Sequence, residues 1–134
     1  MFQRFFSRKS SPLTGAPAVR RQKTYSAQSG YVYQYYYAGH RPFQHGRPTG
    51  VEYVFDVSAD RKTSMPVSVF LGEECLEAWQ TAHTRVLNST ERYAVVKMAL
   101  FQAFDERSHP DLMRQAIHLR AADVDAILGA LNID

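Results

Sequence analysis

Three stretches with alternating side chains decide the fold of this chain: YVYQYYYAG at residues 31–39, VEYVFDVS at 51–58 and MPVSVFL at 65–71. In each, large apolar or aromatic residues recur at every second position, which is typical of a strand with one buried face. The first stretch is expected to end at Gly39, and Pro66 indicates an edge strand or the start of a strand. Because the connections are short, we predict a three-stranded antiparallel meander.

After Gly72 the apolar period changes to three and four residues, which indicates helices. A first helix follows at once, and Asn88 and Glu91 are spaced as a capping box that begins a second, nearly all-apolar helix ending near Glu106. Two further helices are marked by apolar residues, a short one by Leu112, Met113, Ala116 and Ile117, and a last one by Val124, Ile127, Leu128 and Leu131. We therefore predict an α+β domain over residues 30–134, with the meander followed by three or four helices packed on one sheet face.

Charge divides the chain into two parts. All thirteen acidic residues lie after Gly30, whereas six of the sixteen Lys and Arg residues lie before it, which leaves residues 1–29 at +6 and the rest at −3. The first part is also rich in Ser, Pro and Gly, so residues 1–29 are predicted to be a basic leader without stable structure. An electrostatic partner, such as nucleic acid or an anionic lipid surface, is expected to bind this leader.

The leader has several interpretations. Its first residues resemble a short amphipathic helix, and its Arg-rich, acid-poor composition also fits an organelle transit peptide. A terminus with no function is an equal alternative. Since no apolar run approaches the roughly 18 residues that span a bilayer, we expect a soluble protein, cytoplasmic or, if the leader is a transit peptide, in an organelle matrix.

The sheet face away from the helices is the predicted interaction surface. If the alternating tyrosines face the helices, Tyr36, Val54 and Phe70 point outward near the middle of their strands. Monomers rarely leave large apolar patches in water, so this cluster is expected to bind a protein partner or a second copy of the chain. The alternative is that these are scattered exposed apolar residues without a role.

A second candidate site is the segment GHRPFQHGRPTG, residues 39–50, which is predicted to be a loop. It contains His40, Arg41, His45 and Arg47 and no acid, and an arginine pairs well with a phosphate or carboxylate. The segment could therefore bind an anion, although it has no phosphate-loop motif and no helix directly behind it. A solvated, mobile connection is the alternative.

Catalytic and metal sites are not supported by the sequence. Cys75 is the single cysteine, and it lies beside Glu73 and Glu74, which disfavour a thiolate. The five histidines have no spacing that indicates metal ligands. We therefore expect no cofactor and no metal, and we lean against an enzyme.

The sequence as a whole favours a small non-catalytic interaction module. The leading hypothesis is binding of a protein partner, or self-association, through the open sheet face, with the basic leader as an electrostatic tether. The alternative is a nucleic-acid or anion-binding protein that uses the leader and the 39–50 loop. Neither the partner nor the biological process follows from the sequence.

Overall fold

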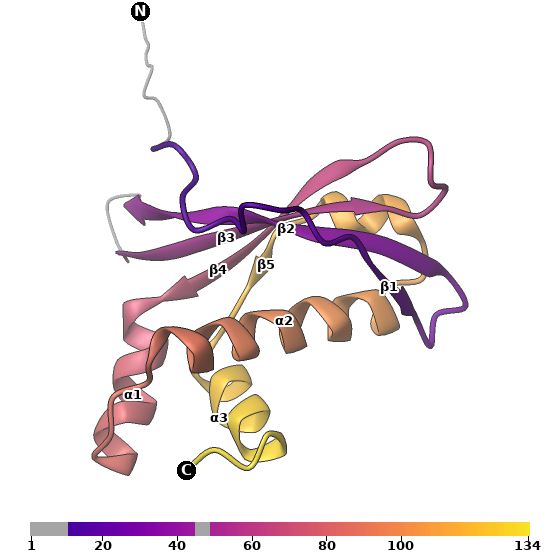
Figure 1. Cartoon of the computed structure of the whole chain (residues 1–134). Coiled ribbons are helices and arrows are strands. Elements are labelled where there is room, and N and C mark those ends of the chain that lie inside the picture. Colours follow the sequence, from indigo (N-terminus) through magenta and orange to yellow (C-terminus); the bar gives the residue numbers. More distant parts are fainter. Residues whose placement is uncertain (1–10, 45–48) are drawn as a thin grey trace, which may run out of the picture.

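The computed structural model describes residues 11–44 and 49–134. Sheet and helices form two layers, with α2 running along one face of the sheet (Figure 1). In chain order the elements are β1 Lys23–Ser26, β2 Val32–Gln44, β3 Thr49–Ser58, β4 Met65–Gly72, α1 Glu73–His83, α2 Ser89–Glu106, the 3₁₀ helix η1 Pro110–Arg114, β5 Ile117–His118 and α3 Ala121–Ala130. The predicted α+β class is confirmed.

The predicted three-stranded meander is wrong, because the sheet has five strands in the order β1-β2-β3-β4-β5. The first four strands pair antiparallel, whereas β5 pairs parallel to β4, with Ile117 beside Val69 and His118 beside Phe70. The short helix predicted from Leu112, Met113, Ala116 and Ile117 is found only in part, because Leu112 and Met113 lie in η1 whereas Ile117 lies in β5. After η1 the backbone bonds to β4 instead of continuing as a helix, with Leu119 N–H donating to Phe70 O at 3.1 Å.

Strand β1 comes from the end of the predicted leader. The sequence KTYS carries one large apolar side chain, so it has no alternation that a strand prediction can use. Tyr25 holds the strand in place, since its ring stacks on Phe101 of α2 at 4.4 Å and its hydroxyl donates to Asp105 at 2.8 Å. The strand therefore depends on contacts with a helix almost eighty residues away in the chain.

Strands β2 and β3 form a longer hairpin than expected. The predicted loop over residues 39–50 is for the most part strand, because β2 continues to Gln44 and β3 begins at Thr49. The pairing register shifts between Tyr37 and Gly39, where β2 has a bulge. A bulge inserts one residue and reverses which side chains face the helices. Past it, His40 rather than Arg41 lies on the helix side, and its ring nitrogen is 2.7 Å from the Tyr37 hydroxyl.

The core lies between the sheet and α2. Tyr33 of β2 stacks on Phe104 of α2 at 4.2 Å between ring centroids, and both rings are fully buried. The predicted capping box at the start of α2 is confirmed, with Asn88 accepting from Glu91 N–H at 2.8 Å and Glu91 accepting from Asn88 N–H at 3.0 Å. This cap fixes where α2 begins.

Candidate functional site

The segment before β1, residues 11–22, follows the free edge of β2 and is called the edge segment below (Figure 1). Thr14 and His40 exchange two backbone hydrogen bonds of 2.9 and 2.8 Å, and further along Lys23 pairs with Tyr35. Between these two attachments the edge segment has residues 15–22, whereas β2 has only residues 36–39. The longer chain must bow away from the shorter one, and this opens a hollow at the sheet edge.

We call this hollow the edge pocket. Its volume is about 220 Å³, and it is bounded by the edge segment, β1, β2 and α2. The lining residues are Pro17, Arg21, Lys23, Tyr35, Tyr36, Tyr37, Tyr93 and Lys97. The pocket therefore combines three cations with four tyrosines, and no acid is found among the described residues that line it.

The charge in the edge pocket is unbalanced. Among the described residues, Arg21, Lys23 and Lys97 form no ion pair with a carboxylate. The Lys97 ammonium lies 5.7 Å from the centre of the Tyr35 ring and 5.9 Å from that of Tyr93. Burial lowers the pKa of Lys97, and the neighbouring Lys23 lowers it further. An anion held by Arg21 and Lys23 would offset the repulsion among the cations that line the pocket.

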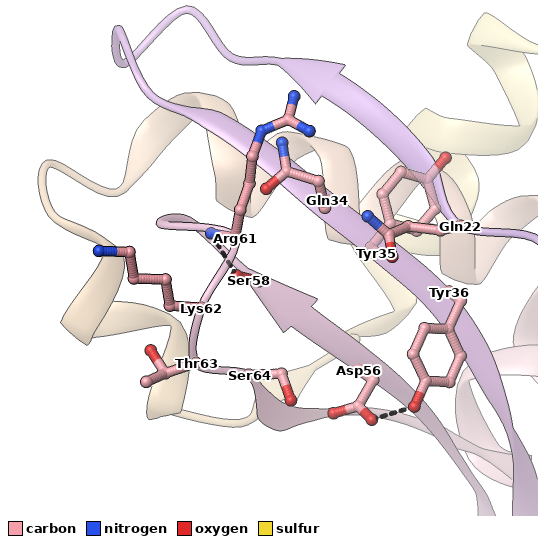
Figure 2. Close-up of a pocket in the computed structure, with 10 residues that line it drawn as sticks. All are labelled: Gln22, Gln34, Tyr35, Tyr36, Asp56, Ser58, Arg61, Lys62, Thr63 and Ser64. Atoms are coloured by element: carbon pink, nitrogen blue, oxygen red, sulfur yellow. Dashed lines mark hydrogen bonds between the residues drawn. The ribbon is translucent and has the colours of Figure 1, made fainter.

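A second hollow of about 220 Å³, the outer pocket, lies across β2 and β3 on the face away from α2 (Figure 2). Arg61 and Lys62 of the β3–β4 turn and the amide of Gln34 line it. Its wall also includes Asp56, which accepts a hydrogen bond from the Tyr36 hydroxyl. The carboxylate makes the outer pocket mixed in charge, so it is a weaker candidate for anion binding than the edge pocket.

The three residues of the predicted docking surface have different environments. Tyr36 is half-buried beneath the Arg20 guanidinium, which lies 4.8 Å from its ring centre. Val54 is only 5% exposed, so its expected exposure is wrong. Val54 pairs with Gly39 of β2. A Cβ placed on Gly39 would stand 2.7 Å from the carbonyl oxygen of Thr14, so the edge segment lies close to this part of the sheet.

Phe70 lies half-buried in a row of rings on the outer face. It stacks on His118 at 4.8 Å and meets Phe43 edge to face at 5.1 Å. With Val54 covered, the three side chains do not form one exposed apolar patch. Whether this face binds a partner stays a prediction.

The predicted anion-binding residues of the 39–50 segment do not converge among the residues that the structure describes. Arg41 Nε donates to Glu52 at 2.9 Å, so its charge is already paired, and His40 bonds to Tyr37. His45 and Arg47 lie outside the described residues. The anion-binding role of this segment also stays a prediction.

Other candidate chemistry finds no support in the described part of the chain. Cys75 Sγ donates to the Leu119 carbonyl oxygen at 3.2 Å, and burial, followed by Glu74 and Asp123, raises its pKa, which disfavours a thiolate nucleophile. Within residues 11–44 and 49–134, no three His, Cys, Asp or Glu side chains gather as metal ligands. No helix in these two ranges is long and apolar enough to cross a bilayer.

Sequence reasoning missed most of the edge pocket. Arg21 and Lys23 fall within the predicted leader without stable structure, and Lys97 lies on the helix that the sequence indicates as nearly all-apolar. One signal was present, because Tyr93 and Lys97 are four residues apart and so share a face of an otherwise apolar helix. What brings the edge segment to that face is pairing with β2, which no local pattern encodes.

No protein-family model, curated protein or solved structure matches the chain.

Proposed function

We propose that this protein is a non-catalytic binding module whose edge pocket holds a small anion, a phosphate or carboxylate group. The observation that carries the proposal is the convergence of Arg21, Lys23 and Lys97 on one hollow whose lining, within residues 11–44 and 49–134, includes no acid. Arginine and lysine donate charge-assisted hydrogen bonds to phosphate and carboxylate oxygens, and such bonds are about twice as strong as neutral ones.

The size and walls of the pocket favour a small ligand over a polymer. Pockets for drug-sized ligands have volumes of about 300–1,000 Å³, and the edge pocket, at about 220 Å³, is smaller. Its tyrosines supply an apolar wall in which a charge pair is less screened than in open water. The edge segment borders the pocket between the attachments at Thr14 and Lys23, and its Pro17 and Arg21 form part of the wall.

Calorimetric titration of the full chain with pyrophosphate tests the proposal. The double variant Arg21→Gln/Lys23→Gln is expected to bind at least roughly tenfold more weakly, because each hydrogen bond to a charged group contributes about 1.5–3 kcal/mol. The matched control is Arg61→Gln/Lys62→Gln, which removes the same charge from the outer pocket and is expected to keep nearly all of the affinity.

Two outcomes would contradict the proposal. An equal loss of affinity in the two double variants would mean that pyrophosphate binding depends only on the net charge of the protein. A twelve-nucleotide oligo(dT) that binds far more tightly than pyrophosphate, with affinity falling steeply as salt rises, would assign the basic surface to single-stranded nucleic acid instead.

We do not propose that the outer sheet face binds a partner, because Val54 is buried and the Tyr36 hydroxyl already donates a hydrogen bond to Asp56. Part of the electrostatic role predicted for the basic leader is kept in this proposal. Two of its cations, Arg21 and Lys23, are the residues that we propose for the anion.

A further inference from the structure

Lys97 has an unusual position in the edge pocket. It lies in the middle of α2, and its ammonium is 5.5 Å from the ring centre of Phe101, in addition to its contacts with Tyr35 and Tyr93. Three aromatic rings therefore surround an amine that opens on the hollow lined by Arg21 and Lys23. The side chain is half-buried, so the amine is partly removed from water while still facing a cavity.

The cations that face this amine disfavour its protonated form, whereas the three aromatic rings favour it. Lys23 on β1 and Arg21 on the edge segment are positive, and the tyrosines of β2 and of α2 itself are neutral at physiological pH. Burial is the larger cause of the lowered Lys97 pKa, and the charge of the neighbouring Lys23 lowers it further. Desolvation and an adjacent cation are the two features that activate a lysine nucleophile.

We propose that Lys97 is a reactive amine that captures a carbonyl-bearing anion in the edge pocket as an imine. The neutral Nζ attacks the carbonyl carbon and forms a C–N bond, while the carbonyl π bond breaks and its oxygen takes one of the two Nζ protons through solvent. A second proton from solvent lets this oxygen leave the carbinolamine as water with cleavage of the C–O bond, and the nitrogen returns its remaining proton to solvent. The products are the imine and one water molecule, with no oxidant or reductant needed. Arg21 and Lys23 hold the anionic group of the ligand beside the amine.

This inference rests on the proposed anion site for the part that Arg21 and Lys23 perform, but the reactivity of Lys97 is tested separately. The probe is glyoxylate, which carries an aldehyde and a carboxylate on two carbons. Borohydride reduces the imine to a stable secondary amine, and peptide mass mapping then compares the four lysines of the chain, Lys9, Lys23, Lys62 and Lys97.

At pH 7 and low glyoxylate, the first adduct is expected on Lys97, at a rate at least fivefold above that of any other lysine. The variant Lys97→Arg keeps the charge but removes the nucleophile, so this fast adduct is expected to disappear. Lys62→Arg, at an exposed lysine of the outer pocket, is the matched control and is expected to label as the wild type does. Even labelling of the four lysines would overturn the inference.

A second aldehyde separates the inference from the proposed function. Acetaldehyde has the same chain length but no charge, so it is expected to label Lys97 several times more slowly than glyoxylate, and inorganic phosphate is expected to protect against glyoxylate alone. Suppose that both aldehydes label Lys97 selectively and at the same rate, and that phosphate does not protect Lys97. This result would contradict the proposed anion site but would support the reactivity of the Lys97 amine.

The variant Lys23→Gln reports on the cause of the reactivity. Removing the neighbouring cation raises the pKa of Lys97, so the pH at which acetaldehyde labelling reaches half its maximum should move upward, and the rate at pH 7 should fall by about three- to tenfold. Acetaldehyde is used because its binding does not depend on Lys23. An unchanged pH profile would show that Lys23 does not activate Lys97 and would overturn that part of the inference.

Discussion

At the scale of single residues, two tyrosines differ in whether their hydroxyl has a partner. The Tyr33 side chain is fully buried, and its hydroxyl makes no hydrogen bond among the described residues. The Tyr25 hydroxyl donates to Asp105 at 2.8 Å. A buried polar group without a partner costs about 1–3 kcal/mol of stability.

Tyr33→Phe removes this unpaired hydroxyl and keeps the ring that stacks on Phe104. We expect the free energy of unfolding, measured by urea denaturation, to rise by about 1 kcal/mol. The control Tyr25→Phe removes a hydroxyl that has a partner and is expected to lower it by roughly 1 kcal/mol. A loss of stability in Tyr33→Phe would reveal a hidden hydrogen bond, for example to a buried water.

Asp60 shows how a single carboxylate organises a turn. It accepts hydrogen bonds from the backbone N–H groups of Lys62 and Thr63, both at 2.8 Å, and from the Thr63 hydroxyl at 2.9 Å. The bond from Thr63 N–H, followed by that from Lys62, lowers the pKa of Asp60 to about 2. These bonds favour the charged form, so the turn between β3 and β4 is more stable when Asp60 is ionised.

The pH dependence follows from the direction of this shift. A carboxylate whose pKa is lower in the folded state contributes stability above its unfolded pKa, near 4, and this contribution is lost as pH falls toward 2. Asp60→Asn removes the titrating group. We therefore expect the difference in unfolding free energy between wild type and variant to be constant at pH 5–7 and to shrink between pH 4 and pH 2. A difference that does not change with pH would contradict the role of charge.

At the scale of elements, the bulge in β2 decides which residues face the helices. Gly39 sits at this bulge with a φ of 127°, a region that side chains rarely adopt. A Cβ at this position would stand 2.7 Å from the Thr14 carbonyl oxygen. Gly39 therefore permits both the change of register and the approach of the edge segment.

Gly39→Ala is expected to lower the free energy of unfolding by about 2 kcal/mol, because unfavourable backbone strain of roughly 1–3 kcal/mol adds to the contact with Thr14. Gly30→Ala is the matched control, since Gly30 has a φ of 98° but nothing within 4 Å of its added Cβ. Gly30→Ala is expected to lower the free energy of unfolding by less than Gly39→Ala does. Urea denaturation measures both variants. An equal loss of unfolding free energy in the two would mean that backbone strain accounts for the whole effect and that the contact with the edge segment adds nothing.

At the scale of the whole molecule, the two faces of the sheet contribute unequally to stability. On the helix side Phe104 is fully buried and stacks on Tyr33, whereas on the outer face Phe70 is half-buried beside His118. The difference arises because α2 runs along one face of the sheet and not along the other (Figure 1).

Phe104→Ala is expected to lower the free energy of unfolding by about 3–5 kcal/mol, the usual cost of emptying a packed core position. Phe70→Ala should cost less than half as much, because part of its ring already contacts water. Thermal and urea denaturation would measure both. A similar loss of unfolding free energy in the two variants would mean that packing on the outer face contributes as much to stability as packing on the helix side.

The sequence by itself determined the elements that carry their own local pattern. Tyr53, Phe55 and Val57 alternate as a strand must, and Asn88 and Glu91 cap α2 with their own side chains and backbone. Periodicity and capping act over a few residues, so they can be predicted without knowing what lies opposite. The α+β class follows from these elements.

Only the tertiary structure decided the strands at the two edges of the sheet, the bulge and the edge pocket. Strand β1 forms because Tyr25 packs on α2, and β5 forms because Ile117 lies beside Val69. The pocket exists because the edge segment is longer than the stretch of β2 that it spans. These features depend on contacts between residues far apart in the chain, and such contacts leave no local signal.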